Sequence, residues 1–263
     1  MDPLTILAAL AAGAAIGFVL GLVGGGGSIL AVPLLVYVVG VESPHAAIGT
    51  AAVAVALNAA AGLAGHARAG NVKWPCALVF AGAGVVGALI GAEAGKALDG
   101  EKLLALFGGL MVVIGAIMIW RRGGVEDPDV RLDRTTARHL LPRLIPAGLA
   151  VGLLAGFFGI GGGFLIVPAL LFATAMPTGV AIGTSLVVVT ALGASTAGSY
   201  AVSGLVDWKL VALLVLGGLA GTLPGRLAGR ALAGRKGVLN TGFAMMVIAI
   251  GLAIVWQGIS TFS

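Results

Sequence analysis

A run of four consecutive glycines, Gly24 to Gly27, restricts the possible folds of this chain more than any other feature, because it interrupts an apolar segment and has a second copy. The first copy reads LVGGGGSILAVPLL over Leu22 to Leu35, and the second reads LAGFFGIGGGFLIVPALL over Leu154 to Leu171. A glycine in a helix interior is about 1 kcal/mol less favourable than an alanine. The sequence therefore predicts two places at which the backbone uncoils within apolar surroundings.

The composition of the chain places these two breaks inside a membrane. Hydrophobic residues make up 59% of the 263 residues and charged residues only 10%, and the mean hydropathy is +1.13. Soluble domains are roughly half apolar and a quarter charged. The apolar runs are continuous and lack the alternating segments of about ten residues that are typical of membrane barrels. We therefore expect an all-α polytopic membrane protein.

The sequence also argues against several other kinds of protein. Cys76 is the single cysteine, so we expect no internal disulfide and no metal site. The net charge of +5 comes with arginines in loops between apolar segments, which is typical of cytoplasmic loops and argues against nucleic acid as a partner. The run Leu4 to Val23 has no basic region before it and is expected to be structural, not a signal peptide. Serine-hydrolase, metalloprotease and phosphate-loop motifs are not met, so we expect no enzyme and no cofactor.

The two halves of the chain repeat the same sequence pattern over nearly its whole length. The differences Thr184 minus Thr50 and Trp208 minus Trp74 both equal 134, whereas Pro168 minus Pro33 equals 135. We therefore divide the chain into a first transmembrane repeat (1–120), a cytoplasmic linker (121–143) and a second transmembrane repeat (144–263). The expected segments are Leu4 to Val23, Ser28 to Val39, His45 to His66, Trp74 to Leu98 and Lys102 to Trp120, followed by Leu144 to Phe158, Phe164 to Ala173, Thr178 to Val202, Trp208 to Leu232 and Val238 to Trp256.

The second segment of each half is too short to cross a membrane, because a spanning helix needs about 20 residues. Either it continues its predecessor as one broken helix, which gives parallel repeats, or it returns as a re-entrant hairpin, which gives inverted repeats. The arginines of the linker and those at Arg230 and Arg235 both fall in the cytoplasm only in the second case. We therefore predict two inverted-topology repeats, each a hairpin plus about three transmembrane helices, with both termini extracytoplasmic.

The two glycine-rich breaks resemble a known family. Each is followed by Pro33 or Pro168 and then by a helix that begins with Ala-Ile-Gly-Thr, at Ala47 to Thr50 and Ala181 to Thr184. This pattern resembles the TauE/SafE family of sulfite and organosulfonate exporters, over the whole chain. The resemblance implies a multi-pass secondary transporter of the cell inner membrane for sulfite, sulfoacetate or other sulfonates, with small carboxylates for some relatives.

The breaks are also the predicted substrate site. They would place the N-terminus of a short helix near the membrane midplane, where free N–H groups and the positive end of the helix dipole attract an anion. Ser28 is expected to cap the first of these helices. Thr50 and Asn58 lie on one strip of the third segment, and the matching helix carries a similar strip. The candidate substrate-binding residues are Gly24, Gly25, Gly26, Gly27, Ser28, Thr50, Asn58, Gly159, Gly161, Gly162, Gly163, Thr184, Ser185 and Ser195.

Each of these features has a structural alternative. Glycines also permit close helix packing, and buried hydroxyls often bond to their own backbone. Ile160 and Gly163 stand where the first copy has a glycine and Ser28, so equal roles for the two breaks do not follow. Glu93 and Arg226 lie near helix ends, where interfacial snorkelling is the simpler explanation and proton coupling the alternative. The glycine ladders Gly87, Gly91, Gly95, Gly221, Gly225 and Gly229 are expected to be packing seams.

The sequence therefore predicts a secondary active or facilitative transporter that exports small sulfur-containing anions by alternating access. A transporter or channel for another small anion, such as a carboxylate, is the alternative. The expected partners are the small anionic substrate and membrane lipid. The sequence leaves open whether a proton or other ion is coupled to transport and whether the chain forms a homo-oligomer.

Overall fold

The chain is mainly helical in the part that the structure, a computed structural model, describes, namely residues 2–120, 132–133, 136–159, 163–231 and 236–262. No strand occurs in this part. The elements are α1 (Pro3–Val23), η1 (Gly24–Leu30), α2 (Ala31–Tyr37), α3 (Pro44–Arg68), α4 (Trp74–Lys96), α5 (Gly100–Trp120), α6 (Ala137–Phe158), α7 (Gly163–Thr174), α8 (Thr178–Val202), α9 (Trp208–Ala231) and α10 (Lys236–Phe262). The predicted all-α class is confirmed.

Among the described residues, seven helical stretches are long and apolar enough to cross a membrane. They are Pro3–Tyr37, Pro44–Arg68, Trp74–Lys96, Gly100–Trp120, Ala137–Phe158, Thr178–Val202 and Trp208–Gly229. Leucine, valine and isoleucine side chains on many of them are exposed on the outside of the bundle, as expected for helices that face lipid. The chain is therefore a multi-pass membrane protein.

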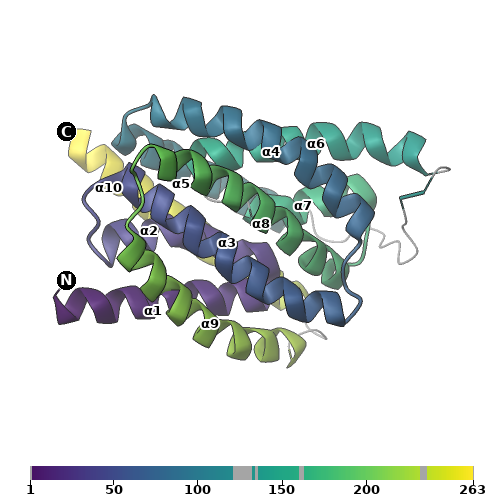
Figure 1. Cartoon of the computed structure of the whole chain (residues 1–263), viewed down its shortest axis with the longest axis horizontal. Helices are drawn as coiled ribbons and strands as arrows, with labels where there is room; N and C mark the ends of the chain where they lie inside the picture. The colour runs from purple at the N-terminus through teal and green to yellow at the C-terminus, as the bar shows by residue number, and fades with distance from the viewer. Residues whose placement is uncertain (1, 121–131, 134–135, 160–162, 232–235, 263) are drawn as a thin grey trace.

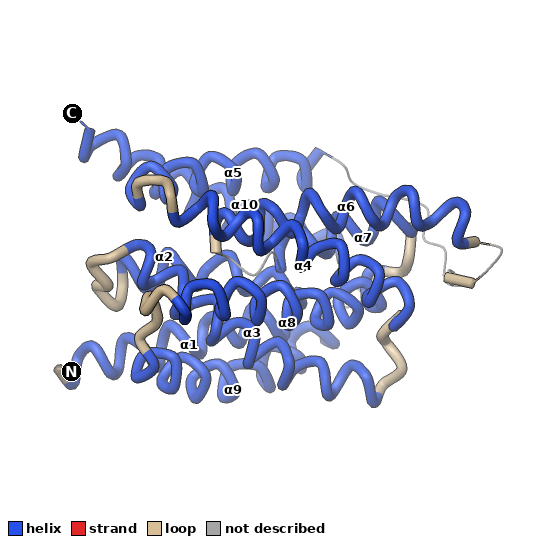
Figure 2. The backbone as a smooth tube through the Cα atoms, turned by 45° about the horizontal axis from the view of Figure 1, so that its top comes forward, coloured by secondary structure: helices blue, strands red, loops and turns tan. Residues whose placement is uncertain are grey.

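The two halves are interlocked, because helices of one half pack against helices of the other. The most extensive contacts join α1 to α9, α4 to α6, α5 to α10 and α3 to α8. Exchanging the halves converts the α1–α9 contact into the α6–α4 contact, so the repeat in the sequence is also a repeat in the packing. Both termini lie at one end of the bundle, whereas α6 begins at the opposite end (Figures 1 and 2). Inverted repeats would give this arrangement, but the inverted topology, which was predicted from the arginines, stays a prediction.

Glycines make the closest helix contacts. A methyl group at Gly91 of α4 would overlap the carbonyl of Leu153 on α6, and one at Gly225 of α9 would overlap the carbonyl of Phe18 on α1. Small residues let helix backbones approach to this extent, which is the main packing device inside membranes. The glycine ladders are therefore packing seams, as the sequence predicted.

Helix α6 begins at Ala137, earlier than the expected start at Leu144. Asp133 and Thr136 form the turn that precedes the helix, because each accepts a hydrogen bond from the other's backbone: Thr136 N donates to Asp133 Oδ1 at 2.9 Å, and Asp133 N donates to Thr136 Oγ1 at 3.0 Å. This exchange resembles a capping box. Residues 137–143, which were predicted to belong to the linker, are helical.

Candidate substrate site at the glycine breaks

The first break is wound more tightly than an α-helix and is not uncoiled. Gly24 ends α1 with a positive φ of 74°, and the 3-10 helix η1 carries the chain from there to Leu30. Gly27 lies against the backbone of Ile16 and Leu20, so the chain folds back along α1 at this point. A side chain at Gly27 would prevent this close approach, which explains the glycine. The expectation of uncoiled backbone is corrected here.

The second break also begins at a glycine with positive φ. Helix α6 ends at Phe158, and Gly159 terminates it in the left-handed conformation with φ 65° and ψ 22°. Such a glycine cap leaves the helix without the strain that a Cβ atom would cause. Helix α7 begins at Gly163. The predictions that concern Ile160, Gly161 and Gly162 lie outside the described residues.

The two breaks meet in the interior of the bundle. A Cβ atom on Gly25 would lie 2.6 Å from the carbonyl oxygen of Gly163, and one on Gly163 would lie 2.7 Å from Ser28 Oγ. All seven residues of η1 are buried, and Ser28 has no exposed surface. The structure therefore brings together three of the candidate residues, Gly25, Ser28 and Gly163, although they come from different halves of the chain.

Ser28 does not cap the helix that follows it. Its Oγ donates a hydrogen bond to the carbonyl of Gly25 at 3.0 Å, and the residue before α2 is Leu30, which makes no side-chain cap. The prediction of a serine cap is therefore wrong. The reason is that Ser28 lies inside the 3-10 helix, where its hydroxyl reaches the carbonyl one turn back.

Each break is seated against the Ala-Ile-Gly-Thr motif of the other half. Gly24 packs against Ile182 of α8, and Gly159 packs against Ile48 of α3. These four residues are equivalent in pairs, and both glycines have positive φ. Two crossed contacts therefore hold the tips of the two breaks in the same way.

Thr50 and Thr184 join the halves in a second crossed pair. Thr50 Oγ1 accepts a hydrogen bond from Asp207 N, and Thr184 Oγ1 accepts one from Lys73 N, each at 3.0 Å. Asp207 and Lys73 directly precede α9 and α4, so each threonine anchors the start of a helix of the other half. This position favours a structural role for both hydroxyls.

The same two threonines lie at opposite ends of the bundle. Gly49, near the start of α3, contacts Tyr200 near the end of α8, while Gly183, near the start of α8, contacts His66 near the end of α3. The two helices are therefore antiparallel. Sixteen residues of helix, from position 50 to position 66, span about 24 Å, so Thr50 and Thr184 do not share one pocket for a small anion.

Asn58 is buried and only partly hydrogen-bonded. Its Nδ2 donates to the carbonyl of Leu214 on α9 at 3.4 Å, whereas its Oδ1 has no hydrogen-bond partner among the described residues. The side chain is 1% exposed and lies against Gly218. A buried polar atom without a partner calls for an explanation, and a ligand that reaches α3 would provide one.

The remaining hydroxyls are on α8. Ser185 Oγ donates to the carbonyl of Ile182 at 2.8 Å, whereas Ser195 Oγ has no partner among the described residues. Sequence reasoning missed Thr196 and Tyr200, which are completely buried and whose hydroxyls likewise have no partner in this part of the chain. Their four-residue spacing beside Ser195 was a signal that could have found them.

A hollow of about 250 Å³ lies elsewhere, between α3 and α8. Apolar residues such as Val53, Ala56 and Ala197 line it, together with Trp208, and none of the candidate residues takes part. Its wall is almost entirely apolar and carries no charge, so we place the candidate site at the contact of the glycine breaks.

A helical bundle with two interlocked halves and a broken segment from each half meeting inside it is the architecture of a membrane transporter. Comparison with known proteins agrees with this class. The model of the family described as "Sulfite exporter TauE/SafE" matches residues 9–254. The chain belongs to this family.

Curated relatives have names of the same kind. A "Probable membrane transporter protein" of Xylella fastidiosa (strain Temecula1) is 45% identical over 253 residues, which cover 96% of each chain. A "Probable membrane transporter protein" of Haemophilus influenzae is 31% identical and covers 76% of this chain and 75% of its own. The "Probable membrane transporter protein YdhB" of Bacillus subtilis is 27% identical, with 80% and 84% covered. No solved structure matches the chain.

Proposed function

We propose that the chain exports small sulfur-containing oxyanions, such as sulfite, sulfoacetate or another organosulfonate, across the inner membrane by alternating access. The observation that carries the proposal is the contact of Gly25 with Gly163 beside the buried Ser28. The name of the family supports a sulfur oxyanion as the substrate.

The chemistry of this contact suits an oxyanion. Helix α7 begins at Gly163, and the first N–H groups of a helix have no partner within it. They carry the positive end of the helix dipole, which favours a negative charge. Because the breaks touch each other in the structure, the anion would enter after they separate, and their contact is the closed state of the proposed cycle.

Export needs no coupled ion under this proposal. The inside-negative membrane potential favours outward movement of an anion by roughly 2.3 kcal/mol per charge per 100 mV. Uptake of the same anion would require a coupled cation. A transporter or channel for a small carboxylate is the second candidate, because the names of the relatives specify no substrate.

Flux of radiolabelled sulfite from proteoliposomes tests the proposal, with sulfoacetate, taurine, sulfate, lactate and acetate as competitors. We expect saturable flux that sulfonates inhibit and acetate does not. Ser28→Ala should reduce kcat/KM at least ten-fold, because it removes a hydroxyl from the contact of the breaks. Thr190→Ala is the matched control, since Thr190 Oγ1 only donates to the carbonyl of Leu186 on its own helix, at 2.7 Å.

Three outcomes would count against the proposal. A current that rises linearly with concentration would identify a channel. Saturable flux of lactate or acetate without flux of sulfite would identify a carboxylate carrier. Equal flux in the Ser28→Ala and Thr190→Ala variants would remove the glycine breaks as the site.

A further inference from the structure

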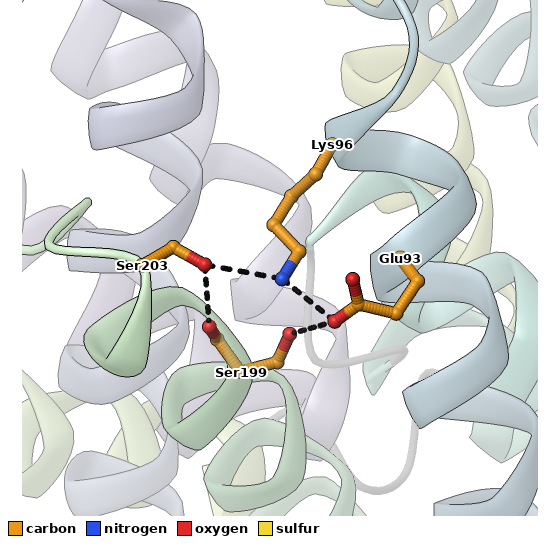
Figure 3. Close-up of polar contacts among 4 residues, drawn as sticks. All are labelled: Glu93, Lys96, Ser199 and Ser203. Atoms are coloured by element: carbon orange, nitrogen blue, oxygen red, sulfur yellow. Dashed lines mark hydrogen bonds and ion pairs between the residues drawn. The ribbon is translucent and has the colours of Figure 1, made fainter.

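Four polar residues join the C-terminal ends of α4 and α8 in one cluster, which Figure 3 shows. Lys96 Nζ lies 2.6 Å from Glu93 Oε1, and Ser199 Oγ donates to the same carboxylate oxygen at 2.9 Å. Lys96 Nζ also donates to Ser203 Oγ at 3.1 Å, and Ser203 Oγ donates to the carbonyl of Ser199 at 3.1 Å. An ammonium group and a hydroxyl group therefore converge on one anionic oxygen.

The two charged side chains differ in exposure. The Lys96 side chain is 17% exposed, whereas that of Glu93 is 70% exposed. The ammonium group is thus largely covered, and the carboxylate that neutralises it is largely in solvent. Exposed ion pairs contribute little to stability, so another anion can replace the Glu93 carboxylate at small cost while the Lys96 charge still needs a partner.

The cluster is a feature of one half only. With the offset of 134 residues, the positions equivalent to Glu93, Ser199 and Ser203 are Leu227, Gly65 and Ala69, none of which can form it. The packing of repeated helices therefore does not require the cluster. It lies at the end of the bundle that also carries both termini (Figure 1).

Unsatisfied hydroxyl groups continue from this cluster into the protein along α8. Lys96 Nζ lies 5.9 Å from the centre of the Tyr200 ring. The hydroxyls of Tyr200 and Thr196 are completely buried and have no partner among the described residues. Thr190 on the same helix donates its hydroxyl hydrogen to a backbone carbonyl one turn earlier. The Thr196 hydroxyl makes no such bond within the part of the chain that the structure describes. Such groups are expected to find a partner in a bound water or ligand.

We propose that Lys96, Ser199 and Ser203 form a second binding site for the transported oxyanion, in which the Glu93 carboxylate takes the place of the anion while none is bound. The Tyr200 and Thr196 hydroxyls extend this site toward the interior. A sulfite or sulfonate has three oxygens that accept hydrogen bonds from the Lys96 ammonium and the Ser199 hydroxyl, while Ser203 holds the ammonium by accepting its hydrogen bond, and Glu93 then turns to solvent. The inference rests on the proposed function for the identity of the anion.

Sulfite binding to the purified full-length chain tests this site, measured as the concentration that raises the melting temperature half-maximally in maltoside detergent. Lys96→Gln should weaken sulfite binding about ten-fold or more, because it removes a charge-assisted hydrogen bond. Glu93→Gln should strengthen it, since the competing carboxylate is lost. Lys96→Arg should retain most of the affinity.

Lys102→Gln is the matched control, because Lys102 is exposed at the start of α5, close in sequence to the cluster, and the substitution changes the charge equally. Ser199→Ala provides an independent test if Lys96→Gln does not fold, with an expected loss of several-fold. Equal affinities in the Lys96→Gln and Lys102→Gln variants would overturn the proposal. So would a Glu93→Gln variant that binds sulfite more weakly, because the cluster would then be a structural ion pair.

Lipid phosphate is chemically similar to the proposed ligand, so phosphatidylglycerol is added in a parallel titration. Stabilisation by this lipid that depends on Lys96, without stabilisation by sulfite, would identify a headgroup site and overturn the inference. Sulfite binding that depends on Lys96, without any flux, would support this site and refute export. Flux that Ser28→Ala abolishes and Lys96→Gln leaves unchanged, in KM as well as in kcat, would refute this site alone.

Discussion

Replacing Gly163 by alanine would insert one methyl group at the point where the two glycine breaks touch. The added Cβ would overlap the carbonyl oxygen of Gly25 and would lie 2.6 Å from its carbonyl carbon and 2.7 Å from Ser28 Oγ. Most of this contact is with backbone, so rotation of a side chain cannot relieve it. Gly163 is the first residue of α7 and is not among the glycines with positive φ. Its backbone conformation therefore accepts alanine, and the contact with Gly25 decides the effect.

The expected magnitude follows from two opposing terms. Alanine in place of glycine stabilises by about 0.4–1 kcal/mol by reducing the conformational entropy of the unfolded chain, and overpacking of a buried site costs about 1–3 kcal/mol. Because the overlap with Gly25 is severe, we take the upper value, which leaves a net loss of about 2 kcal/mol. For a domain of this size such a loss lowers Tm by about 4–8 °C. The wedge also disfavours the closed state, so sulfite flux should fall at least ten-fold.

Thermal unfolding in detergent and flux in proteoliposomes measure the two effects. Gly179→Ala is the control, because Gly179 lies in the first turn of α8 with no atom within 4 Å of the added methyl group. This variant should keep its flux and keep or raise its Tm. If Gly163→Ala resembles Gly179→Ala in both Tm and flux, the contact of the breaks is neither tight nor part of the transport cycle.

Three further predictions concern Asn58, Thr50 and the orientation of the chain. Asn58→Leu should raise the free energy of unfolding by about 1 kcal/mol, because it removes a buried unpaired oxygen. It should also reduce sulfite flux at least ten-fold, and unchanged flux would show that the Asn58 amide has no role in transport. Thr50→Ala should lower the free energy of unfolding by about 1 kcal/mol, because the hydrogen bond from Asp207 N is lost. Thr50→Ser keeps the hydroxyl and should be as stable as the original chain. Equal melting curves for the two variants would contradict the anchoring role of Thr50. In a Cys76→Ser background, cysteine at the exposed position Glu101 should react with an impermeant maleimide in intact cells, and cysteine at the exposed position Asn71 only after permeabilisation; the reverse pattern would invert the predicted orientation.

The helices could be predicted because the sequence features that indicate them are either local or present in both halves. Long apolar runs identify spanning helices by length, and the offset of 134 residues identifies the equivalent elements. The early start of α6 was missed because the capping exchange of Asp133 and Thr136 lies within a polar stretch that was assigned to the linker. The packing of α1 against α9 could not be predicted either, because a repeat in the sequence does not show which helices of the two halves contact each other.

The candidate site was predictable only in part, for a related reason. The glycine runs indicated where the chain breaks, and the two breaks do meet, at Gly25 and Gly163. Helical spacing placed Thr50 on a common face with Asn58, but the direction of that face and the partner of each hydroxyl depend on the neighbouring helices. The bond from Asp207 to Thr50 joins residues 157 positions apart, and no local pattern reveals it.

Comparing equivalent positions of the two halves distinguishes two kinds of residue. Some maintain the fold in both halves, and others give the two halves different properties. Thr50 and Thr184 make equivalent bonds, so the architecture itself explains both. Asn58 breaks the symmetry, because it faces Gly218 where the equivalent Leu192 faces Gly84. In an inverted-repeat carrier with identical halves, the states open to the two sides would have equal free energy, and only differences between the halves can favour one state. Polar residues whose equivalents are apolar or glycine, such as Asn58, Glu93 and Ser199, are therefore the positions at which substitution should change the preference for one side of the membrane.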